Sequence, residues 1–286
     1  MLSDYLPPHV GGGVEKVVSE ICWGLARRGH TVEALGLRTC LAPRDEIDRG
    51  VNIRRVPALD LTGLIGVQFA FSVHVLPALV RSIRNFRPDV IHAHSLFFRT
   101  TEAAALASVF FRTPLVTTLH LAAMDTGPLA MKALMGLYNS TVGRFIIRRS
   151  DQTIAVSAAV AEHARAVGGT TQPITVVHNG VNTQLFRPGG TQPNGRPTVL
   201  FVGRLVHNKG PQTLIEAVPR VLRSHPNCVF LLAGIGPLRQ ALESRARKMG
   251  VSEAVEFLGV RDDVPQLMRR SLVFVRPSSL EGLPLT

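Results

Sequence analysis

The sequence predicts an α/β protein built from two halves, each a doubly wound parallel sheet covered by helices. Short apolar runs alternate with helical segments, as in parallel strands joined by helices. This alternation stops at residues 187–197, which hold three prolines and three glycines, and then restarts. The 286 residues suffice for two domains, and 45% of them are hydrophobic, so each half can bury a core. We therefore predict domains at 1–186 and 198–286, joined by a linker at 187–197.

The first half begins with a strand of which only residues 1–3 are present. A helix follows, with Val14, Val17, Val18 and Ile21 on one face. Strands are predicted at 31–37, 51–57, 89–95, 114–120 and 152–157, and helices at 14–28, up to about 86, at 99–110, at 130–149 and after 157. Residues 174–182 close this half.

The second half repeats the alternation and ends on a strand with no helix after it. Because both ends look cut, we expect the chain to be a fragment of a longer protein. Strands are predicted at 198–205, 228–236, 255–260 and 272–278, and helices at 212–223, 238–249 and 264–270.

The charge balance is basic. Lysine and arginine outnumber aspartate and glutamate by 32 to 20, which favours an anionic partner such as a nucleotide phosphate or an acidic membrane surface. The charge is scattered, and there is no zinc-finger spacing or aromatic-rich RNA-binding signature, so we expect no nucleic acid partner. The three cysteines are far apart and no signal peptide pattern is present, which suits a reducing cytoplasm.

Residues 61–80 carry no Asp, Glu, Lys or Arg and are just long enough to cross a membrane. Gln68, His74 and Pro77 interrupt the apolar character, so a buried or surface-lying helix is the better interpretation. Its basic end could contact anionic lipid headgroups, which would place the protein peripherally at the inner face of a membrane. That end carries Arg81, Arg84 and Arg87.

In open parallel sheets, ligands bind beyond the carboxyl ends of the strands. Gly11, Gly12 and Gly13 lie between a strand and a helix, where glycines allow close backbone approach and a helix N-terminus favours an anion. The spacing is neither GxGxxG nor a P-loop, and a merely flexible turn is the alternative.

Histidines end two predicted strands of the first half. His120 ends one, and His92 and His94 point to the same face near the end of another. A lone histidine is usually structural, so this interpretation of His120 stays open. No Cys or carboxylate ligand is near in sequence, so we predict no metal site.

In the second half, Arg204 and Lys209 lie on a loop between a strand and a helix. Two cations there suit a diphosphate, although a solvated loop would look the same. Glu281 follows the last strand, where its carboxylate can accept hydrogen bonds from sugar hydroxyls.

Several motifs occur in order: PPHVGGGVE, DVIHAHS, LVTTLH, IAVS, VVHNGVNTQLFRP, LFVGRLVHNKG, LLAGIGP, FLGV and VRPSSLEGLPLT. The ordered set resembles the retaining GT-B glycosyltransferases of the family 4 type over essentially the whole chain. The resemblance implies two Rossmann-like domains that face a cleft, with an incomplete C-terminal one. It further implies that the first domain binds the acceptor and the second binds a nucleotide-diphosphate sugar, such as a UDP- or GDP-sugar. Transfer would keep the anomeric configuration and need no metal or other cofactor.

The resemblance also assigns roles by position. His120 would contact the donor sugar near the reacting carbon, while Arg204 and Lys209 would neutralise the leaving diphosphate. Glu281 would be the first glutamate of the family's E-x7-E motif and hold sugar hydroxyls. Further donor-binding residues would be Gly12, Gly13, Gly259, Val260, Gly282, Leu283, Pro284 and Leu285.

The second glutamate of E-x7-E would fall beyond Thr286, so we expect weak donor binding and slow turnover from these 286 residues. A dehydrogenase would need GxGxxG with an acidic residue about 20 positions on, an arrangement this sequence lacks. A non-catalytic scaffold of the same fold is the alternative function. The acceptor remains open between a soluble molecule and a lipid-linked one of glycolipid or polysaccharide synthesis in the cell envelope.

Overall fold

The computed structural model describes residues 1–8, 12–62, 69–121, 129–169, 173–189, 195–279 and 281–286. The chain forms two compact units. The first unit is Met1–Gly180 with Gly282–Leu285, and the second unit is Val181–Glu281 with Thr286. The domain boundary at 186 and the linker at 187–197 stay predictions, and residues 190–194 of that linker lie outside the described residues.

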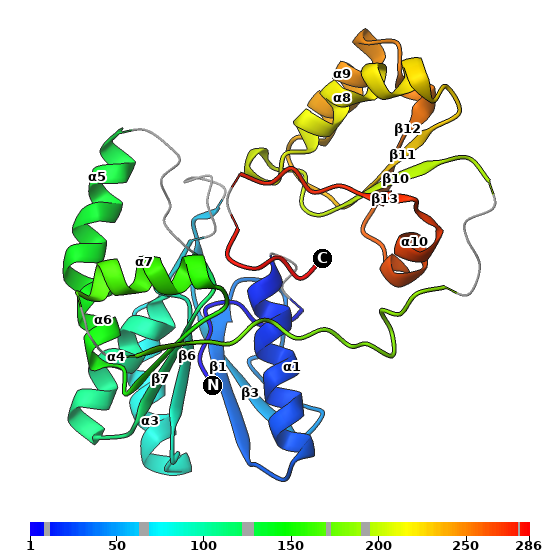
Figure 1. The fold of residues 1–286 in the computed structure, drawn as a ribbon. Coiled ribbons are helices and arrows are strands. Elements are labelled where there is room, and N and C mark those ends of the chain that lie inside the picture. The colour runs from blue at the N-terminus through cyan, green and yellow to red at the C-terminus, as the bar shows by residue number, and fades with distance from the viewer. Residues whose placement is uncertain (9–11, 63–68, 122–128, 170–172, 190–194, 280) are drawn as a thin grey trace. The chain divides into compact units, whose positions relative to one another are not determined.

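The first unit is built around a largely parallel sheet whose halves meet at the N-terminus (Figure 1). Leu2 pairs with Leu35 on one side and with Ala93 on the other, so residues 1–3 act as the central strand. The backbone N–H of Leu2 donates to the His92 carbonyl over 2.8 Å. The order is β2 (Asp45–Asp48), β3 (Val51–Pro57), β1 (Val32–Arg38), Leu2, β6 (Ile91–His94), β7 (Leu115–Leu119), β8 (Gln152–Ala155) and β9 (Ile174–Val176).

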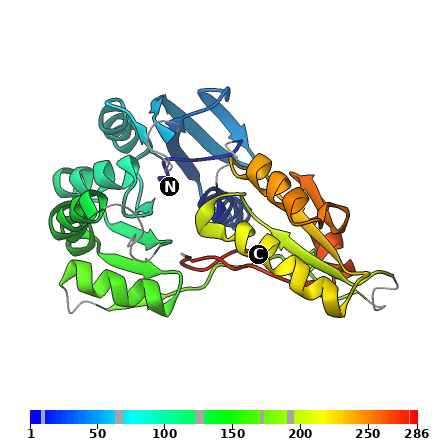
Figure 2. The ribbon, with the colours of Figure 1, turned by 90° about the horizontal axis from the view of Figure 1, so that it is seen from above.

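Helices cover both faces of this sheet, as the alternation of β1 side chains requires. Val32 and Ala34 pack with α1 (Gly13–Arg27), which Figure 2 shows end-on. Leu35 and Leu37 point to the opposite face and join the larger core. The helices of that core are α3 (Val75–Phe86), α4 (Arg99–Phe111), α6 (Arg144–Arg149) and α7 (Ala158–Gly168).

The predicted helix at 130–149 is confirmed as an uninterrupted run with a π-helical turn in the middle. It consists of α5 (Leu129–Tyr138), the turn Asn139–Gly143 and α6.

The helix predicted to end near residue 86 is wrong at its start. It begins only at Val75, and the chain before it forms β4 (Leu59–Asp60) and β5 (Ala70–Phe71), which pair antiparallel. Pro77 explains the late start, because proline fits the first turn of a helix but disrupts an interior. Residues 63–68 of the tested membrane segment lie outside the described residues. In the ranges that are described, no helix is long and apolar enough to cross a membrane.

Strand β2 was not predicted, because its sequence, DEID, is almost entirely polar. It pairs antiparallel with β3 through a two-residue hairpin loop, Arg49 and Gly50, both with positive φ (49° and 81°). This geometry matches the tight turn that favours hairpins, and it lets a charged strand close the edge of the sheet.

The second unit confirms the predicted doubly wound parallel sheet. Its strand order is β12 (Val255–Gly259), β11 (Val229–Ala233), β10 (Thr198–Val202) and β13 (Val273–Phe274). The order therefore reverses between β10 and β13. Helices α8 (Pro211–Ser224) and α9 (Arg239–Lys248) pack on one face, and α10 (Val264–Arg270) packs on the other (Figure 1).

Candidate active site

The reversal point of the second sheet brings two loops together, residues 203–210 after β10 and, after β13, residues 275–279 and 281. The Ser279 N–H donates to the Asn208 carbonyl over 3.0 Å. Gly210 has a φ of +73°, and a Cβ there would lie 2.0 Å from the Pro277 carbonyl oxygen. Only glycine allows this approach, so the glycine after Lys209 fixes the spacing of the two loops.

Three charged side chains converge between these loops. Lys209 Nζ lies 2.6 Å from Glu281 Oε1, and Arg276 donates to the same oxygen from Nη2 over 2.6 Å and from Nε over 3.1 Å. All three side chains are mostly buried. Burial alone would raise the pKa of Glu281, but the hydrogen bonds from Lys209 and Arg276 outweigh it and lower that pKa. The carboxylate is therefore ionised at neutral pH.

Arg204 completes the cluster without joining its hydrogen bonds. Its guanidinium makes no hydrogen bond or ion pair with the part of the chain that the structure describes. Burial lowers the pKa of Lys209 most, and the charges of Arg276 and Arg204 lower it further despite the bond to Glu281. Two cations bind the carboxylate of Glu281 and Arg204 lies near one of them, Lys209, which leaves an excess of two positive charges at the ends of β10 and β13.

Close glycine contacts also hold the loops after β11. A Cβ on Gly234 would lie 1.9 Å from the Gly203 carbonyl oxygen, and one on Gly236 would lie 2.4 Å from the Leu205 carbonyl oxygen. Strand β12 ends at Gly259, Val260 follows it, and the strand lies two positions away from β10 in the sheet. No recorded contact between described residues links this pair with the charged cluster.

The first unit brings other predicted residues together. Gly12 caps α1 in an extended conformation, and α1 begins at Gly13, whereas Gly11 lies outside the described residues. A Cβ on Gly13 would lie 3.3 Å from a methyl carbon of Leu285. The Asn179 side-chain amide donates to the Leu283 carbonyl over 3.0 Å. The segment Gly282–Leu285 is thus bound to the first unit, although Pro284 itself is exposed.

Gly282 makes the tightest of these contacts. A Cβ there would lie 2.0 Å from the backbone oxygen of His120 and 2.8 Å from its carbonyl carbon. Backbone cannot yield as a flexible side chain can, so the segment can pack on the end of β7 only with glycine at this position.

His120 belongs to a stack of three histidine rings at the ends of β6 and β7. Ring centroids are 4.3 Å apart for His92 and His94, and 5.3 Å apart for His94 and His120. Burial lowers the pKa of His92 to about 3 and that of His120 to about 4, and it lowers the pKa of His94 well below its usual value. All three rings are therefore neutral at pH 7.

Sequence reasoning missed Arg276 and Arg55. Arg276 carried a signal, since it directly follows an apolar strand at the point where the strand order reverses. Arg55 carried one too, because strand alternation places it in the row of Val51 and Ile53, on a buried face. A charge in such a row needs a specific partner.

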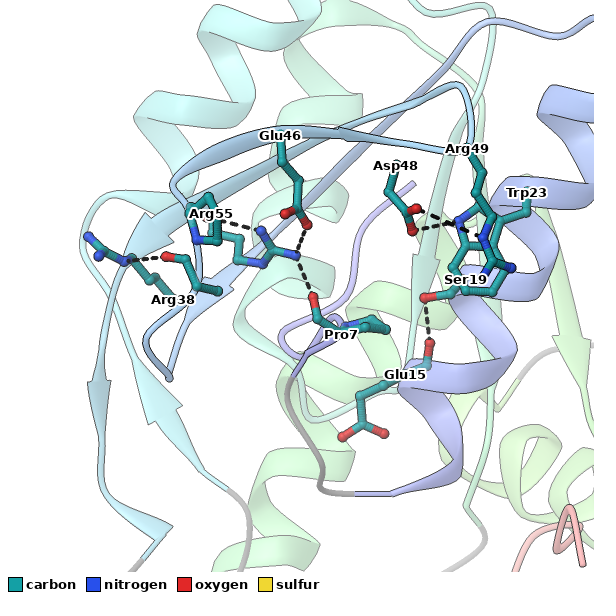
Figure 3. Close-up of polar contacts among 11 residues, drawn as sticks. Pro7, Glu15, Ser19, Trp23, Arg38, Glu46, Asp48, Arg49 and Arg55 are labelled. Carbon is teal, nitrogen blue, oxygen red and sulfur yellow. Dashed lines mark hydrogen bonds and ion pairs between the residues drawn. The ribbon is translucent and has the colours of Figure 1, made fainter. Parts of the chain in front are cut away.

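Figure 3 shows the hydrogen-bond partners of the buried Arg55 guanidinium, whose Nε alone has none among the described residues. Only 1% of its surface is exposed. It donates to the Pro43 carbonyl over 3.0 Å, to Glu46 over 2.5 Å and to the Pro7 carbonyl. Pro7 lies on the chain that leads from the central strand to the glycine turn, so Arg55 holds the start of that turn.

A cavity of about 260 Å³ lies beside Arg55 and includes the carboxylates of Glu46 and Asp48 in its lining. Glu46 is bound to Arg55, and Asp48 accepts from the Trp23 indole over 3.0 Å, as Figure 3 shows. Both carboxylates thus have partners within the unit. Within the described ranges, no group of three or more His, Cys, Asp or Glu side chains is placed to hold a metal ion. Metal-independent transfer stays a prediction.

Comparison with known proteins agrees with the resemblance. The model of Glycosyltransferase Family 4 matches residues 11–185, and that of Glycosyl transferases group 1 matches residues 182–286. The glycogen synthase of Mycobacterium tuberculosis is 29% identical over all of this chain and 73% of its own length. The D-inositol 3-phosphate glycosyltransferase of Acidothermus cellulolyticus is 29% identical over 96% of this chain and 67% of its own length.

Solved structures share the fold. Anabaena Alr3699/HepE in complex with UDP has a TM-score of 0.72 at 19% identity, over 97% of this chain and 73% of its own. WaaG, a glycosyltransferase involved in lipopolysaccharide biosynthesis, has a TM-score of 0.60 at 15% identity, over 95% and 73%. The family 4 model alone covers more than half of the chain. The chain therefore belongs to glycosyltransferase family 4 and has the GT-B fold.

Proposed function

We propose that the chain transfers a sugar from a nucleotide-diphosphate sugar to an acceptor, with retention of anomeric configuration and without a divalent cation. The charged cluster of Arg204, Lys209, Arg276 and Glu281 carries this proposal. Its two excess positive charges match the two negative charges of a sugar nucleotide diphosphate. The leaving nucleoside diphosphate gains a further negative charge, which preorganised cations stabilise without a metal. The structures of Anabaena Alr3699/HepE with UDP and with UDP-glucose support this type of donor.

In this proposal, the hydrogen bonds already made within the cluster decide which role each side chain has. Arg204 has its guanidinium available for the diphosphate, and Lys209 shares its ammonium between Glu281 and a ligand. Glu281 holds a sugar hydroxyl with Oε2, because the recorded hydrogen bonds all go to Oε1. The family resemblance also assigns donor binding to the amides of 282–285 and to Gly12 and Gly13, and we include them in the proposal.

Retention is proposed through front-face attack, in which the departing diphosphate takes the acceptor proton. A carboxylate bound by two cations is a poor nucleophile, which favours this route over a glycosyl–Glu281 intermediate. Proton NMR of the first product formed tests the point. An α-linked product from an α-linked donor is expected, and a β-linked product would contradict retention.

A lipid-linked acceptor of the cell envelope and a peripheral membrane location are part of the proposal. Arg81, Arg84 and Arg87 are exposed on α3 or directly after it. Helix α5 has no buried residue and exposes leucines, with Leu129 at 83%. Cosedimentation with anionic but not zwitterionic vesicles is expected. If the chain still binds vesicles after these arginines are removed, and also binds zwitterionic vesicles, the proposed electrostatic attraction to the membrane is contradicted.

Titration calorimetry with UDP, GDP and ADP tests donor binding directly. At least one nucleotide should bind, and Arg204→Ala or Lys209→Ala should weaken it about 10- to 100-fold, as for a lost charge-assisted bond. Arg245→Ala is the matched control, because Arg245 pairs with Glu216 on the surface of α8 and α9. Binding of no nucleotide would favour the non-catalytic scaffold instead.

A further inference from the structure

The hydrogen atoms of the histidine stack can be placed from its contacts. His94 Nε2 lies 3.0 Å from the sulfur of Met1, and His94 Nδ1 lies 3.0 Å from His120 Nε2. His94 is fully buried, whereas His120 keeps 9% of its surface exposed. Of these two rings, His120 is the one that a ligand can reach.

A thioether sulfur carries no hydrogen and can only accept. The contact with Met1 therefore requires the proton of His94 to be on Nε2. Burial keeps His94 neutral, so it has one ring proton and its Nδ1 is bare. A bare nitrogen accepts, so the bond between the rings requires the proton of His120 to be on Nε2. Since His120 is also neutral at pH 7, its own Nδ1 is bare.

We propose that His94 is a positioning residue that fixes His120 in the Nε2–H tautomer, so that His120 offers Nδ1 as an acceptor to a hydroxyl group of the donor sugar. The role toward the sugar rests on the proposed function, while the tautomer does not. Gly282 supports the same geometry from the backbone side, because it packs against the His120 carbonyl.

This arrangement suits a reaction in which positive charge develops on the sugar. A neutral ring avoids repelling that charge, and an acceptor nitrogen can orient a hydroxyl without donating a proton. The opposite tautomer would present an N–H donor and leave Nδ1 of His94 facing another lone pair. The His94 ring thus determines whether His120 presents an acceptor or a donor, without itself contacting the sugar.

Long-range nitrogen–proton NMR of the ¹⁵N-histidine chain at pH 7.5, without ligand, tests the tautomer. His94 and His120 should each show a protonated Nε2 and a bare Nδ1. A protonated Nδ1 on either ring would overturn the proposal. His94→Phe removes the acceptor and should give His120 a mixed tautomer. An unchanged His120 signature in that variant would also overturn it.

Binding then separates positioning from folding. His94→Phe should weaken UDP-glucose or GDP-mannose, whichever binds the unmodified chain, about 5- to 10-fold, as expected for one hydrogen bond, and leave UDP or GDP unchanged. His94→Asn can restore an acceptor and should recover most of the loss. His92→Phe is the control, since the recorded bond of His92 goes to Thr118 over 2.7 Å. Equal losses for the nucleotide and the nucleotide sugar would overturn the positioning role. If the tautomer is as assigned but no nucleotide sugar binds, the proposed function fails and the tautomer assignment stands.

Discussion

Both units place candidate site residues at the ends of parallel strands, but these side chains are neutral in the first unit and charged in the second. In the first unit, burial without a carboxylate partner makes His92, His94 and His120 neutral. In the second unit, groups that keep 15–21% of their side-chain surface exposed stay charged, because Glu281 binds both Lys209 and Arg276. Burial therefore does not decide the charge of a site by itself. The partner supplied by the neighbouring loop decides it.

The largest expected effect follows from removing the shared carboxylate. Glu281→Ala leaves two mostly buried cations facing each other and should destabilise the chain by about 2–4 kcal/mol, as for a broken buried pair. Chemical denaturation followed by circular dichroism measures this loss. Glu253→Ala is the control, because Glu253 is exposed and should change stability by less than about 0.5 kcal/mol. Similar losses in the two variants would contradict the central place of Glu281.

A steric change in the first unit ranks next. Gly282→Ala forces a Cβ to within 2.0 Å of the His120 backbone oxygen, so the segment must move. We expect a loss of about 1–3 kcal/mol, typical of overpacking, together with weaker nucleotide-sugar binding. Gly180→Ala has open space around its Cβ and serves as the control. The account of this contact fails if both variants retain full stability and binding.

The neutral histidines predict a pH effect of intermediate size. The pKa of His120 is lowered to about 4, so on acidification from about pH 6.5 the unfolded chain takes up a proton that the folded chain refuses. Each such histidine should therefore reduce stability by up to about 1.4 kcal/mol per pH unit as pH falls through this window.

Asp4 opposes this trend, because burial raises its pKa to about 6 despite its hydrogen bonds to the start of α4. The contribution of Asp4 to the stability of the chain is therefore lost as pH rises through the same range. The comparison of His120→Asn with the unmodified chain isolates the histidine. The unmodified chain should lose more stability between pH 7 and pH 5. Parallel pH profiles would contradict a neutral buried His120.

The smallest expected change concerns the anchor of the glycine turn. Arg55→Lys keeps the charge but cannot reach three partners with one ammonium, so we expect a loss of about 1 kcal/mol and faster hydrogen exchange at the amide of Leu6, which precedes Pro7. Arg54→Lys is the neighbouring control, since Arg54 pairs with Asp45 at the surface. Equal exchange rates in both variants would count against Arg55 as an anchor.

Much of the fold was predictable, because buried parallel strands have continuous runs of apolar residues in the sequence, and the helices that cover them have apolar residues at helical spacing. Strand β2 escaped because an edge strand faces water and needs no apolar run. The late start of α3 depends on Pro77, because proline fits the first turn of a helix and disrupts its interior. The family resemblance named Lys209 and Glu281, and the structure brings them into one ion pair.

Other parts of the site depend on which loops meet. Arg276 reaches Glu281 because the chain after β13 folds back toward the β10 loop. The local sequence does not predict this meeting of the two loops. The acceptor character of His120 depends on Met1 and His94, which are far away in sequence. Such information resides in tertiary contacts rather than in motifs.

The salt dependence of nucleotide binding tests the contrast between the two units most directly. Affinity for UDP, or for whichever nucleotide binds best, should fall several-fold from low to high salt, because a partly exposed charged cluster is screened. That dependence should shrink in Arg204→Ala and stay unchanged in His120→Asn. Salt dependence that is unaffected by Arg204→Ala, or that is lost with His120→Asn, would contradict a charged binding site in the second unit and a neutral one in the first.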